Sequence, residues 1–410
     1  MLTRSCSGSG RPAVCIVHHY YYPQHGHVRR DAEALARAGY AVTVIALQQP
    51  GQARYERVNG IDVHRLPLAH RRGSILSYGL EYGRLIGMAF LLLTKLHLQK
   101  RFQVIEIDNM PDVLVFSALV PKLMGAKIVL YLFDSMSEIF MLTRGAGRNH
   151  PAVRLLVLEE RISAAFADRA IVPHHPFRET IHAHGVPREK MTVVLNGPDD
   201  AIFTPRPPRA TEPVDETFEI VTHGTILERF GIQVLIRALP RLLERVPGAR
   251  VTVYGEGEYR RTLETLARQL GVADRVRFGG WVPLDDLPSV LSRFDVGYVG
   301  MLCDNMLSNK LMEYVALRLP VVAARWPTYE HYFDDACVAF FGPGSPGALA
   351  DALVNVHRDR SAARQRAERA AARFEPYRWS VQRQAYLGVY EALTASASAR
   401  RPALALVEEH

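Results

Sequence analysis

The alternation of short apolar runs with segments of helical period is the feature that most restricts the folds open to this chain. The run AVCIVHHYYYP at 13–23 is followed by a helical pattern at 29–40 and by the β-branched run AVTVIAL at 41–47. Strand, helix and strand in that order form a βαβ unit, whose two strands are parallel. The order recurs through residues 102–134 and 169–197, so the first half predicts a parallel sheet flanked by helices.

A proline-rich segment separates two halves of this kind. Residues 204–217 read TPRPPRATEPVDET, and this density of prolines leaves no room for a packed helix or strand. The second half restarts with the apolar run FEIVTHGT at 218–225, and further strands are predicted at 249–257, 276–282, 295–300 and 320–324. A chain of 410 residues is also long enough for two hydrophobic cores.

The predicted fold class is therefore α/β, with two Rossmann-like, doubly wound domains. In such sheets ligands bind at the carboxyl ends of the strands, and we expect these ends to face each other across a cleft. The predicted divisions are an N-terminal, acceptor-binding domain at 1–205, a linker at 206–217, a C-terminal, donor-binding domain at 218–375, a helix at 376–395 that packs back on the first domain, and a flexible tail at 396–410.

Charge and cysteine content narrow the choice of partners and compartment. A net charge of +8 favours anionic partners such as phosphates or an acidic membrane surface, although an arginine-rich composition can also serve solubility alone. The four cysteines show no CxxC spacing, and no apolar segment of signal-peptide length opens the chain, so a cytoplasmic location is predicted. The apolar run at 85–93 is shorter than the roughly 20 residues that span a bilayer.

The segment LSNKLMEYVALRLPVVA at 307–323 is the first candidate for a binding site. Ser308 is a suitable N-cap, so Asn309 and Lys310 fall in the first helical turn, where backbone N–H groups bind anions. Lys310 adds a point charge for a diphosphate. Glu313 lies about one turn further on and would repel phosphate, which favours contact with ribose hydroxyls. The alternative is a solvent-exposed Lys–Glu pair on a surface helix.

Two other loops follow strands of the same predicted sheet. Gly255 and Gly257 in VYGEG allow a ligand to approach the backbone closely, although a plain turn would also use them. Gly224, Thr225 and Arg229 lie in HGTILERFG, and Arg229 suits bidentate phosphate contact unless it is simply a solvated loop residue. Because the carboxyl ends of parallel strands share one edge of a sheet, these loops should meet the segment at 307–323.

Polar residues also follow strands in the first half. Asp108, Asn109 and Asp112 in IDNMPD are predicted to bind the acceptor, with helix capping by Asp112 and turn formation at Asn109 as the alternative. Gly26 lies in the histidine-rich loop HHYYYPQHGH and is predicted to bind donor phosphate or acceptor. A zinc site is disfavoured there, because no cysteine or carboxylate completes the set.

The motifs HGTILERFG, VYGEG, VRFGGWVPLDDL and NKLMEYVALRLPVVA occur in the order found in family-four glycosyltransferases. The second half resembles the donor-binding half of these enzymes, which retain anomeric configuration and have the GT-B fold. The opening strand, glycine-containing loop and first helix of the first half are similar too, so the resemblance covers roughly residues 13–392. The variant NKLMEY resembles a subgroup of bacterial polysaccharide enzymes.

The resemblance implies roles for single residues of the second half. Glu313 matches the second glutamate of the family's paired motif, which contacts ribose, and Lys310 is implied for the diphosphate. The first glutamate, beside the donor sugar, is replaced by Asn305. The family's arginine and lysine after the first glycine are replaced by Thr225 and Phe230, and Arg229, one position away, is the candidate to act for them.

Three further positions complete the set. Asp134 is kept from the family's strand ending in "HD", while the histidine is replaced by Phe133. Base specificity is expected from backbone contacts near Gly257 and Val282. Arg318 occupies the family's helix-ending glycine position, where a left-handed backbone would cost on the order of 1 kcal/mol.

The implied function is retaining transfer of a sugar from a nucleotide sugar to an acceptor in cell-surface polysaccharide or glycolipid synthesis. Lys310, Arg229 and the helix start at Ser308 would stabilise the departing diphosphate without a metal or cofactor. A lipid-linked glycan is the expected acceptor, and no nucleic-acid partner is expected. Basic residues around the apolar run at 85–98 suit an anionic membrane surface, unless that run is a core helix. The alternatives are a nucleotide-sugar 2-epimerase-like enzyme and a non-catalytic GT-B-like binding subunit.

Overall fold

The computed structural model describes residues 11–68, 75–205, 217–304 and 306–399. The chain forms two compact units: an N-terminal unit, Met1–Val194 with Arg383–His410, and a C-terminal unit, Leu195–Gln382. The units divide after Val194 and again after Gln382. The predicted boundaries were residues 205 and 375, and the second observed boundary falls inside the helix predicted at 376–395. Most of the predicted linker at 206–217, and the end of the predicted tail at 396–410, lie outside the described residues.

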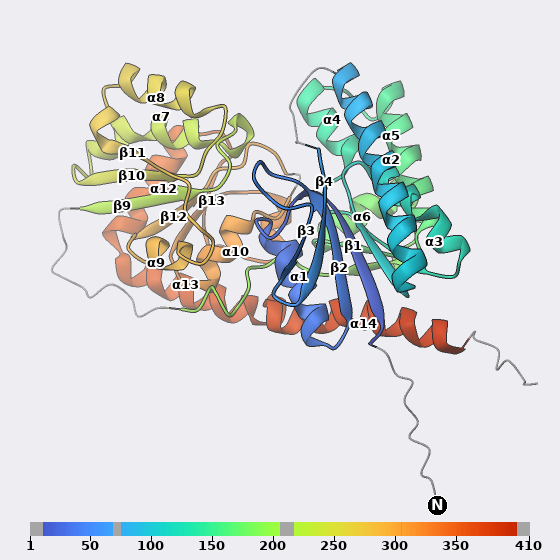
Figure 1. The fold of residues 1–410 in the computed structure, drawn as a ribbon. Helices are drawn as coiled ribbons and strands as arrows, with labels where there is room; N and C mark the ends of the chain where they lie inside the picture. Colours follow the sequence, from blue (N-terminus) through green and yellow to red (C-terminus); the bar gives the residue numbers. More distant parts are fainter. Residues whose placement is uncertain (1–10, 69–74, 206–216, 305, 400–410) are drawn as a thin grey trace, which may run out of the picture. The chain divides into compact units, whose positions relative to one another are not determined.

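The N-terminal unit is built on an eight-stranded sheet with the order β3-β4-β2-β1-β5-β6-β7-β8 (Figure 1). The strands are β1 (Ala13–Tyr21), β2 (Ala41–Leu47), β3 (Tyr55–Val58), β4 (Ile61–Leu66), β5 (Val104–Asp108), β6 (Lys127–Tyr131), β7 (Arg169–Val172) and β8 (Met191–Val193). All neighbours are parallel except β3 and β4. This hairpin was not predicted, although Asn59 and Gly60, with φ of 50° and 80°, are the Asn-Gly turn typical of two-residue hairpins.

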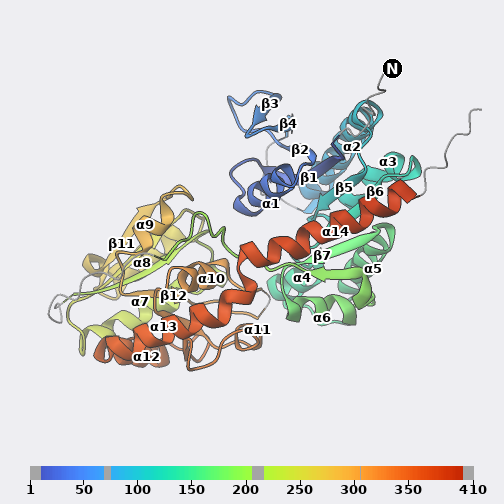
Figure 2. The ribbon, with the colours of Figure 1, turned by 90° about the horizontal axis from the view of Figure 1, so that it is seen from below.

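Helices cover both faces of this sheet. They are α1 (Gly26–Arg37), α2 (Ile75–Lys100), the 3-10 helix η1 (Asp112–Ala118), α3 (Leu119–Leu123), α4 (Met136–Arg144), α5 (Pro151–Phe166), α6 (His175–Ala183), η2 (Arg188–Lys190) and α14 (Trp379–Ala399). Ile105 and Ile107 of β5 enter the core under α2, η1 and α5. Glu106 points to the other face, where it accepts hydrogen bonds from Tyr386 and Tyr390 of α14 at 3.3 and 2.8 Å. Figure 2 shows α14 running along this side of the sheet.

The C-terminal unit has a six-stranded, fully parallel sheet with the order β11-β10-β9-β12-β13-β14. The strands are β9 (Phe218–His223), β10 (Ala249–Tyr254), β11 (Val276–Gly280), β12 (Val296–Val299), β13 (Val321–Ala324) and β14 (Ala339–Phe341). The helices are η3 (Glu228–Phe230), α7 (Ile232–Leu243), α8 (Arg260–Gln269), η4 (Ala273–Arg275), α9 (Leu287–Leu291), α10 (Asn309–Ala316), α11 (Pro327–Glu330), α12 (Pro346–Arg358), α13 (Arg360–Phe374) and η5 (Glu375–Tyr377).

The strand order reverses at one point in each sheet. In the N-terminal unit β1 lies between β2 and β5, and in the C-terminal unit β9 lies between β10 and β12. The loops that leave the two middle strands diverge at such a switch point, which opens a crevice at the carboxyl edge of a doubly wound sheet. The topology therefore makes the segments after β1 and β5, and those after β9 and β12, the candidate binding loops. Among the described helices, none is both long and apolar enough to cross a membrane.

Candidate functional site

Two cationic side chains meet over one aromatic ring in the C-terminal unit. Lys310, in the first turn of α10, places its Nζ 4.6 Å from the centroid of the Phe230 ring. Arg229, from η3 after β9, places its guanidinium carbon 5.2 Å from the same ring. Each contact is a cation–π interaction. The segments after β9 and β12 thus bring together the two charges predicted to bind a diphosphate. Phe230 was not predicted to take part, because only its lack of charge was considered.

The environment of Lys310 disfavours its charge. The residue is only 8% exposed. Burial lowers the pKa of its ammonium group to about 8, although the nearby Glu313 carboxylate acts in the opposite direction. A buried ammonium group that lacks full hydration gains more from an anion than an exposed one does. This arrangement suits a group that binds a diphosphate.

Glu313 is held at the end of β9 by a histidine. Its Oε2 lies 3.1 Å from Nε2 of His223, and the two side chains are 14% and 8% exposed. His223 is the last residue of β9, and its ring also packs edge-on against Tyr314 at 5.3 Å between centroids. His223 was not predicted as a site residue, although its position immediately before Gly224 at a strand end was a usable signal. A carboxylate fixed in this way can accept hydrogen bonds from hydroxyl groups.

The glycines of this edge are required by the packing of the loops on one another. Gly255 has a φ of 115°, and a Cβ there would lie 1.9 Å from the carbonyl oxygen of Gly224. A Cβ on Gly257 would lie 2.2 Å from the carbonyl oxygen of Ile226. The loops after β9 and β10 can therefore lie against each other only with glycine at these positions. Close approach of a ligand to Gly224, Gly255 and Gly257 stays a prediction.

The structure also shows where the other residues predicted for the donor-binding half lie. Ser308 is the N-cap of α10, which confirms the predicted helix start, although its side chain makes no capping hydrogen bond. Asn309 begins α10 and is exposed, as is Thr225, while Val282 follows β11 and is partly buried. Asn305 lies outside the described residues. Arg318 has a φ of 56°, which confirms the left-handed backbone considered for this position.

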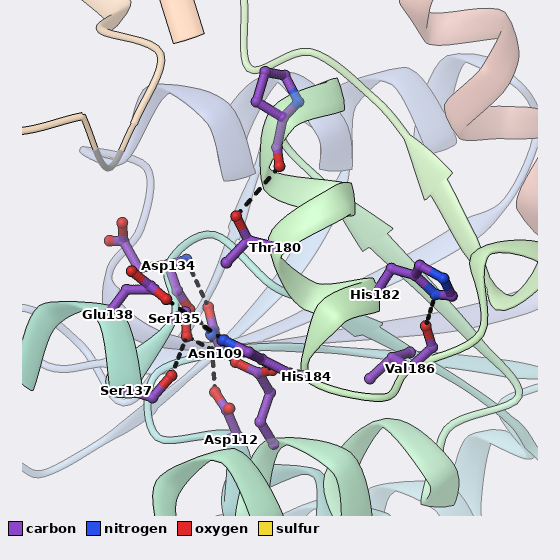
Figure 3. A network of polar contacts seen from close by, with 12 residues as sticks. Asn109, Asp112, Asp134, Ser135, Ser137, Glu138, Thr180, His182, His184 and Val186 are labelled. Atoms are coloured by element: carbon purple, nitrogen blue, oxygen red, sulfur yellow. Dashed lines mark hydrogen bonds and ion pairs between the residues drawn. The ribbon is translucent and has the colours of Figure 1, made fainter. Parts of the chain in front are cut away.

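In the N-terminal unit, Asn109 joins the loops that follow β5 and β6 (Figure 3). Its Nδ2 donates to Oδ1 of Asp112 at 2.8 Å and to the carbonyl oxygen of Asp134 at 2.5 Å. Its Oδ1 accepts the backbone N–H of Phe133 at 2.8 Å. Asn109 therefore fixes the backbone at Asp134, the residue that corresponds to the family's "HD" aspartate.

The two aspartates predicted to bind the acceptor are fully buried. Oδ2 of Asp108 lies 2.9 Å from Nδ1 of His18. Burial raises the pKa of Asp112 well above its usual range, and the charge of Glu159 adds to this effect. The alternative, in which Asp112 caps a helix, is wrong, since Pro111 is the N-cap of η1 and Asp112 is its first residue. A direct contact with an acceptor stays a prediction for Asp108, Asn109 and Asp112, and it would require their exposure.

A second polar network surrounds His184 (Figure 3). The Oγ of Ser135 donates to Oε2 of Glu160 at 2.8 Å, and Oε1 of Glu160 lies 2.8 Å from Nδ1 of His184. On the other side of the ring, Nε2 lies 3.4 Å from Oε1 of Glu138. Burial by itself would lower the pKa of His184, but hydrogen bonds and charges of Glu138 and Glu160 outweigh it and raise the pKa to about 9.

We expect this network to make the stability of the N-terminal unit depend on pH. Because the folded-state pKa of His184 is raised, its stabilising effect is complete below 6.5 and is lost as the pH rises through about 9. Urea unfolding at several pH values should show a fall in midpoint over this window for the wild type. His184→Gln should lack that component, while His182→Gln should keep it. Parallel curves for the wild type and His184→Gln would contradict the assignment.

Uncharged histidines surround Gly26, the first residue of α1. The His25 ring lies 4.7 Å from that of His18 and 5.6 Å from that of His27. Burial lowers the pKa of His18 and His25 to about 3, and it lowers that of His27 well below the usual value. At neutral pH the imidazoles of His18, His25 and His27 are therefore uncharged. Within the described parts of the chain, no group of three or more His, Cys, Asp or Glu side chains could hold a metal ion.

Two family models match the chain. One, described as "Glycosyl transferase 4-like domain", matches residues 9–197, and the other, "Glycosyl transferases group 1", matches residues 217–359. Together they account for most of the 410 residues. The first segment contains the Asn109 and His184 networks, and the second contains the site formed by Arg229, Lys310 and Glu313.

Curated relatives align over shorter segments. A lipopolysaccharide core biosynthesis glycosyltransferase of Rhizobium meliloti is 39% identical over 106 residues, which are 26% of this chain and 29% of that protein. A GDP-mannose-dependent phosphatidylinositol monomannoside mannosyltransferase of Mycolicibacterium smegmatis is 35% identical over 114 residues, 26% of this chain and 29% of that protein. The chain thus spans less than a third of the length of each of these two relatives.

Solved structures match over nearly the whole chain. Sucrose-phosphate synthase from Thermosynechococcus elongatus has a TM-score of 0.78 at 18% identity, with 94% of this chain and 100% of that chain covered. Anabaena HepE in complex with UDP-glucose has a TM-score of 0.68 at 15% identity, with 93% and 99% covered. At these identities the likeness shows the fold alone, and it confirms the predicted GT-B class with two parallel-sheet α/β domains.

Proposed function

Because the chain belongs to the glycosyltransferases described by the group 1 and 4-like models, we propose that it transfers a sugar from a nucleotide sugar to a glycan acceptor. The observation that carries this proposal is the convergence of Lys310 and Arg229 on Phe230 at the switch point of the C-terminal sheet. Departure of a nucleoside diphosphate places negative charge on its phosphates, and fixed cations stabilise that charge.

Different residues of the site bind different parts of the donor. Lys310 and Arg229 bind the diphosphate, and the exposed start of α10 at Asn309 adds backbone N–H groups. Glu313, held by His223, accepts hydrogen bonds from the ribose hydroxyls. Asp134, whose backbone Asn109 fixes, lies at the carboxyl edge of the other sheet and is the candidate on the acceptor side.

The finer features of the reaction belong to the same proposal. Transfer retains the anomeric configuration, requires no metal or cofactor, and serves bacterial cell-surface polysaccharide or glycolipid synthesis. Relatives named for lipopolysaccharide core synthesis and for phosphatidylinositol mannoside support an acceptor linked to lipid. Such an acceptor places the enzyme in the cytoplasm, at the cytoplasmic face of the membrane. The comparisons do not favour the 2-epimerase-like enzyme or the non-catalytic binding subunit.

Titration of the full chain with nucleotides and with inorganic pyrophosphate tests the division of roles. We expect at least one of UDP, GDP and ADP to bind, and Glu313→Gln to weaken that affinity roughly 10-fold or more, since a charged acceptor of ribose hydrogen bonds is lost. Pyrophosphate has no ribose, so Glu313→Gln should not weaken its affinity.

Glu368→Gln is the matched control, because Glu368 is an exposed carboxylate paired with Arg318 at 3.1 Å. It should bind nucleotide as the wild type does. A wild-type protein that binds none of the three nucleotides would refute the proposal. If Glu313→Gln weakens pyrophosphate and nucleotide equally, the ribose role of Glu313 is wrong while the glycosyltransferase proposal remains.

A further inference from the structure

We propose that the outer surface of helices α2, α3 and α5 docks the N-terminal unit on an anionic lipid bilayer. The inference deepens the proposed function, on which it rests for the lipid-linked acceptor, by naming the surface and the chemistry of its partner. Large apolar side chains are exposed on these three helices and at the residue that follows α3: Leu91, Leu98, Leu119, Leu123, Met124, Leu155, Leu158 and Ile162. We call this set the α2–α3–α5 surface.

Helix α2 buries one side in the core of the N-terminal unit, and its outer side exposes two leucines among basic and small residues. Leu85, Ala89 and Leu93 are buried in the core of the N-terminal unit. Leu91, on the other side, is 69% exposed, and Leu98 follows it by two turns on the same side. The side of a surface helix that faces solvent normally carries polar and charged residues, so two exposed leucines on one side are unusual. We therefore expect the outer side of α2 to contact a partner.

The neighbouring helices continue this surface. Leu123 of α3 is 79% exposed, and Leu155 of α5 is 65% exposed. A shallow hollow of about 370 Å³ opens beside α5. Apolar residues that include Leu158, Ile162 and Val186 line it, together with the cationic side chains of Arg161 and Lys190 and with no acidic residue among its described lining. This combination of apolar and cationic lining residues suits a lipid with an anionic headgroup.

The exposed charges among the described side chains of this surface are all positive. Arg84 and Lys95 of α2 and Arg154 and Arg161 of α5 are exposed. No acidic side chain is exposed on α3, on α5 or on α2 from residue 81 onward, within the side chains that the structure describes. The acids nearby are engaged: Glu159 accepts the backbone N–H of Val113, and Asp168 pairs with Lys122 and Lys127.

Charge complementarity favours a bilayer, rather than a second copy of the chain, as the partner of this surface. In a two-fold dimer built on this surface, the same patch would face itself, and its cations would approach one another without exposed carboxylates to balance them. Anionic headgroups neutralise those cations, and the leucines can enter the boundary between headgroups and acyl chains. The combination of exposed leucines with unbalanced cations therefore fits an anionic lipid surface.

Vesicle co-sedimentation of the full chain tests the proposal. We expect binding to vesicles that contain phosphatidylglycerol at low ionic strength, with little binding to pure phosphatidylcholine and a loss of binding at high salt. Leu91→Glu with Leu155→Glu, and Lys95→Glu with Arg161→Glu, should each weaken binding about 10-fold or more. Leu270→Glu in the C-terminal unit is the control, since Leu270 is 37% exposed and lies outside this surface.

Circular dichroism melting should show that each variant is folded, and light scattering after gel filtration should give the same mass for all. The proposal is overturned if the protein binds neutral vesicles equally well, or if the paired variants bind vesicles like the wild type. It is also overturned if the wild type is a dimer that binds no vesicles and the paired variants are monomers. Thermal shifts with UDP, GDP and ADP, recorded on the same samples, separate failure of the surface from failure of the glycosyltransferase proposal. We expect any nucleotide shift of the wild type to be unchanged in both paired variants.

Discussion

Lys310→Met should nearly abolish sugar transfer and should at the same time make the protein more stable at pH 7. Removal of a fixed charge at a developing phosphate typically lowers kcat/KM by about 10²- to 10³-fold. In the absence of donor, however, the same charge is buried and costs free energy of folding. Methionine has a similar length and no charge, so we expect the free energy of unfolding to rise by about 2 kcal/mol at pH 7.

The pH dependence provides a second readout of the same residue. The pKa of Lys310 lies at about 8 in the folded protein, against 10.5 for the free side chain. Because the folded-state pKa is lowered, deprotonation of Lys310 should raise the free energy of unfolding of the wild type as the pH rises from about 8 to 10.5. Below this window the buried charge of Lys310 destabilises the folded protein. Lys310→Met should lack this component in denaturant unfolding measured across the window.

A matched variant separates the site from charge in general. Arg358→Met removes an exposed cation in the last turn of α12 that has no partner among the described residues. It should change neither transfer nor stability by much. A Lys310→Met enzyme that transfers sugar at the wild-type rate, or that unfolds more easily than the wild type at pH 7, would refute the role given to Lys310.

Asn109→Ala should be the most destabilising single change in the N-terminal unit among those considered. The side chain is 7% exposed and makes hydrogen bonds to Asp112, to the carbonyl oxygen of Asp134 and to the N–H of Phe133. Truncation leaves these buried groups without their partner, which costs about 1–3 kcal/mol for each unsatisfied group. We expect a loss of about 3 kcal/mol or more in the free energy of unfolding, measured with urea.

The same measurement decides between two roles for Asn109. Asn149→Ala is the control, because Asn149 is exposed and its removal should change stability by less than about 0.5 kcal/mol. If Asn109 serves only to bind the acceptor, Asn109→Ala will keep wild-type stability and lose acceptor affinity alone. That outcome would contradict the structural role that its hydrogen bonds indicate.

Local patterns were sufficient for most strands and for the motifs of the donor site. The predicted strand at 41–47 agrees with β2 to the residue, and the run at 218–225 contains β9. The β3–β4 hairpin was missed because its strands are short and partly polar, so their apolar period is weak. The unit boundary at Val194 was missed as well, because a proline-rich composition reports local chain geometry and not which residues pack together.

Local sequence was enough to predict the α/β class, the two sheets and the candidates Lys310, Arg229 and Glu313, because strand and helix periods and loop motifs are properties of neighbouring residues. The position of Phe230 beside both cations, and the contact of His223 with Glu313, became apparent only from the packing of the segments. The burial of Asp108 and Asp112 became apparent in the same way. These features depend on which strands become neighbours across a switch point, and burial and pairing between distant segments follow from that order rather than from local sequence.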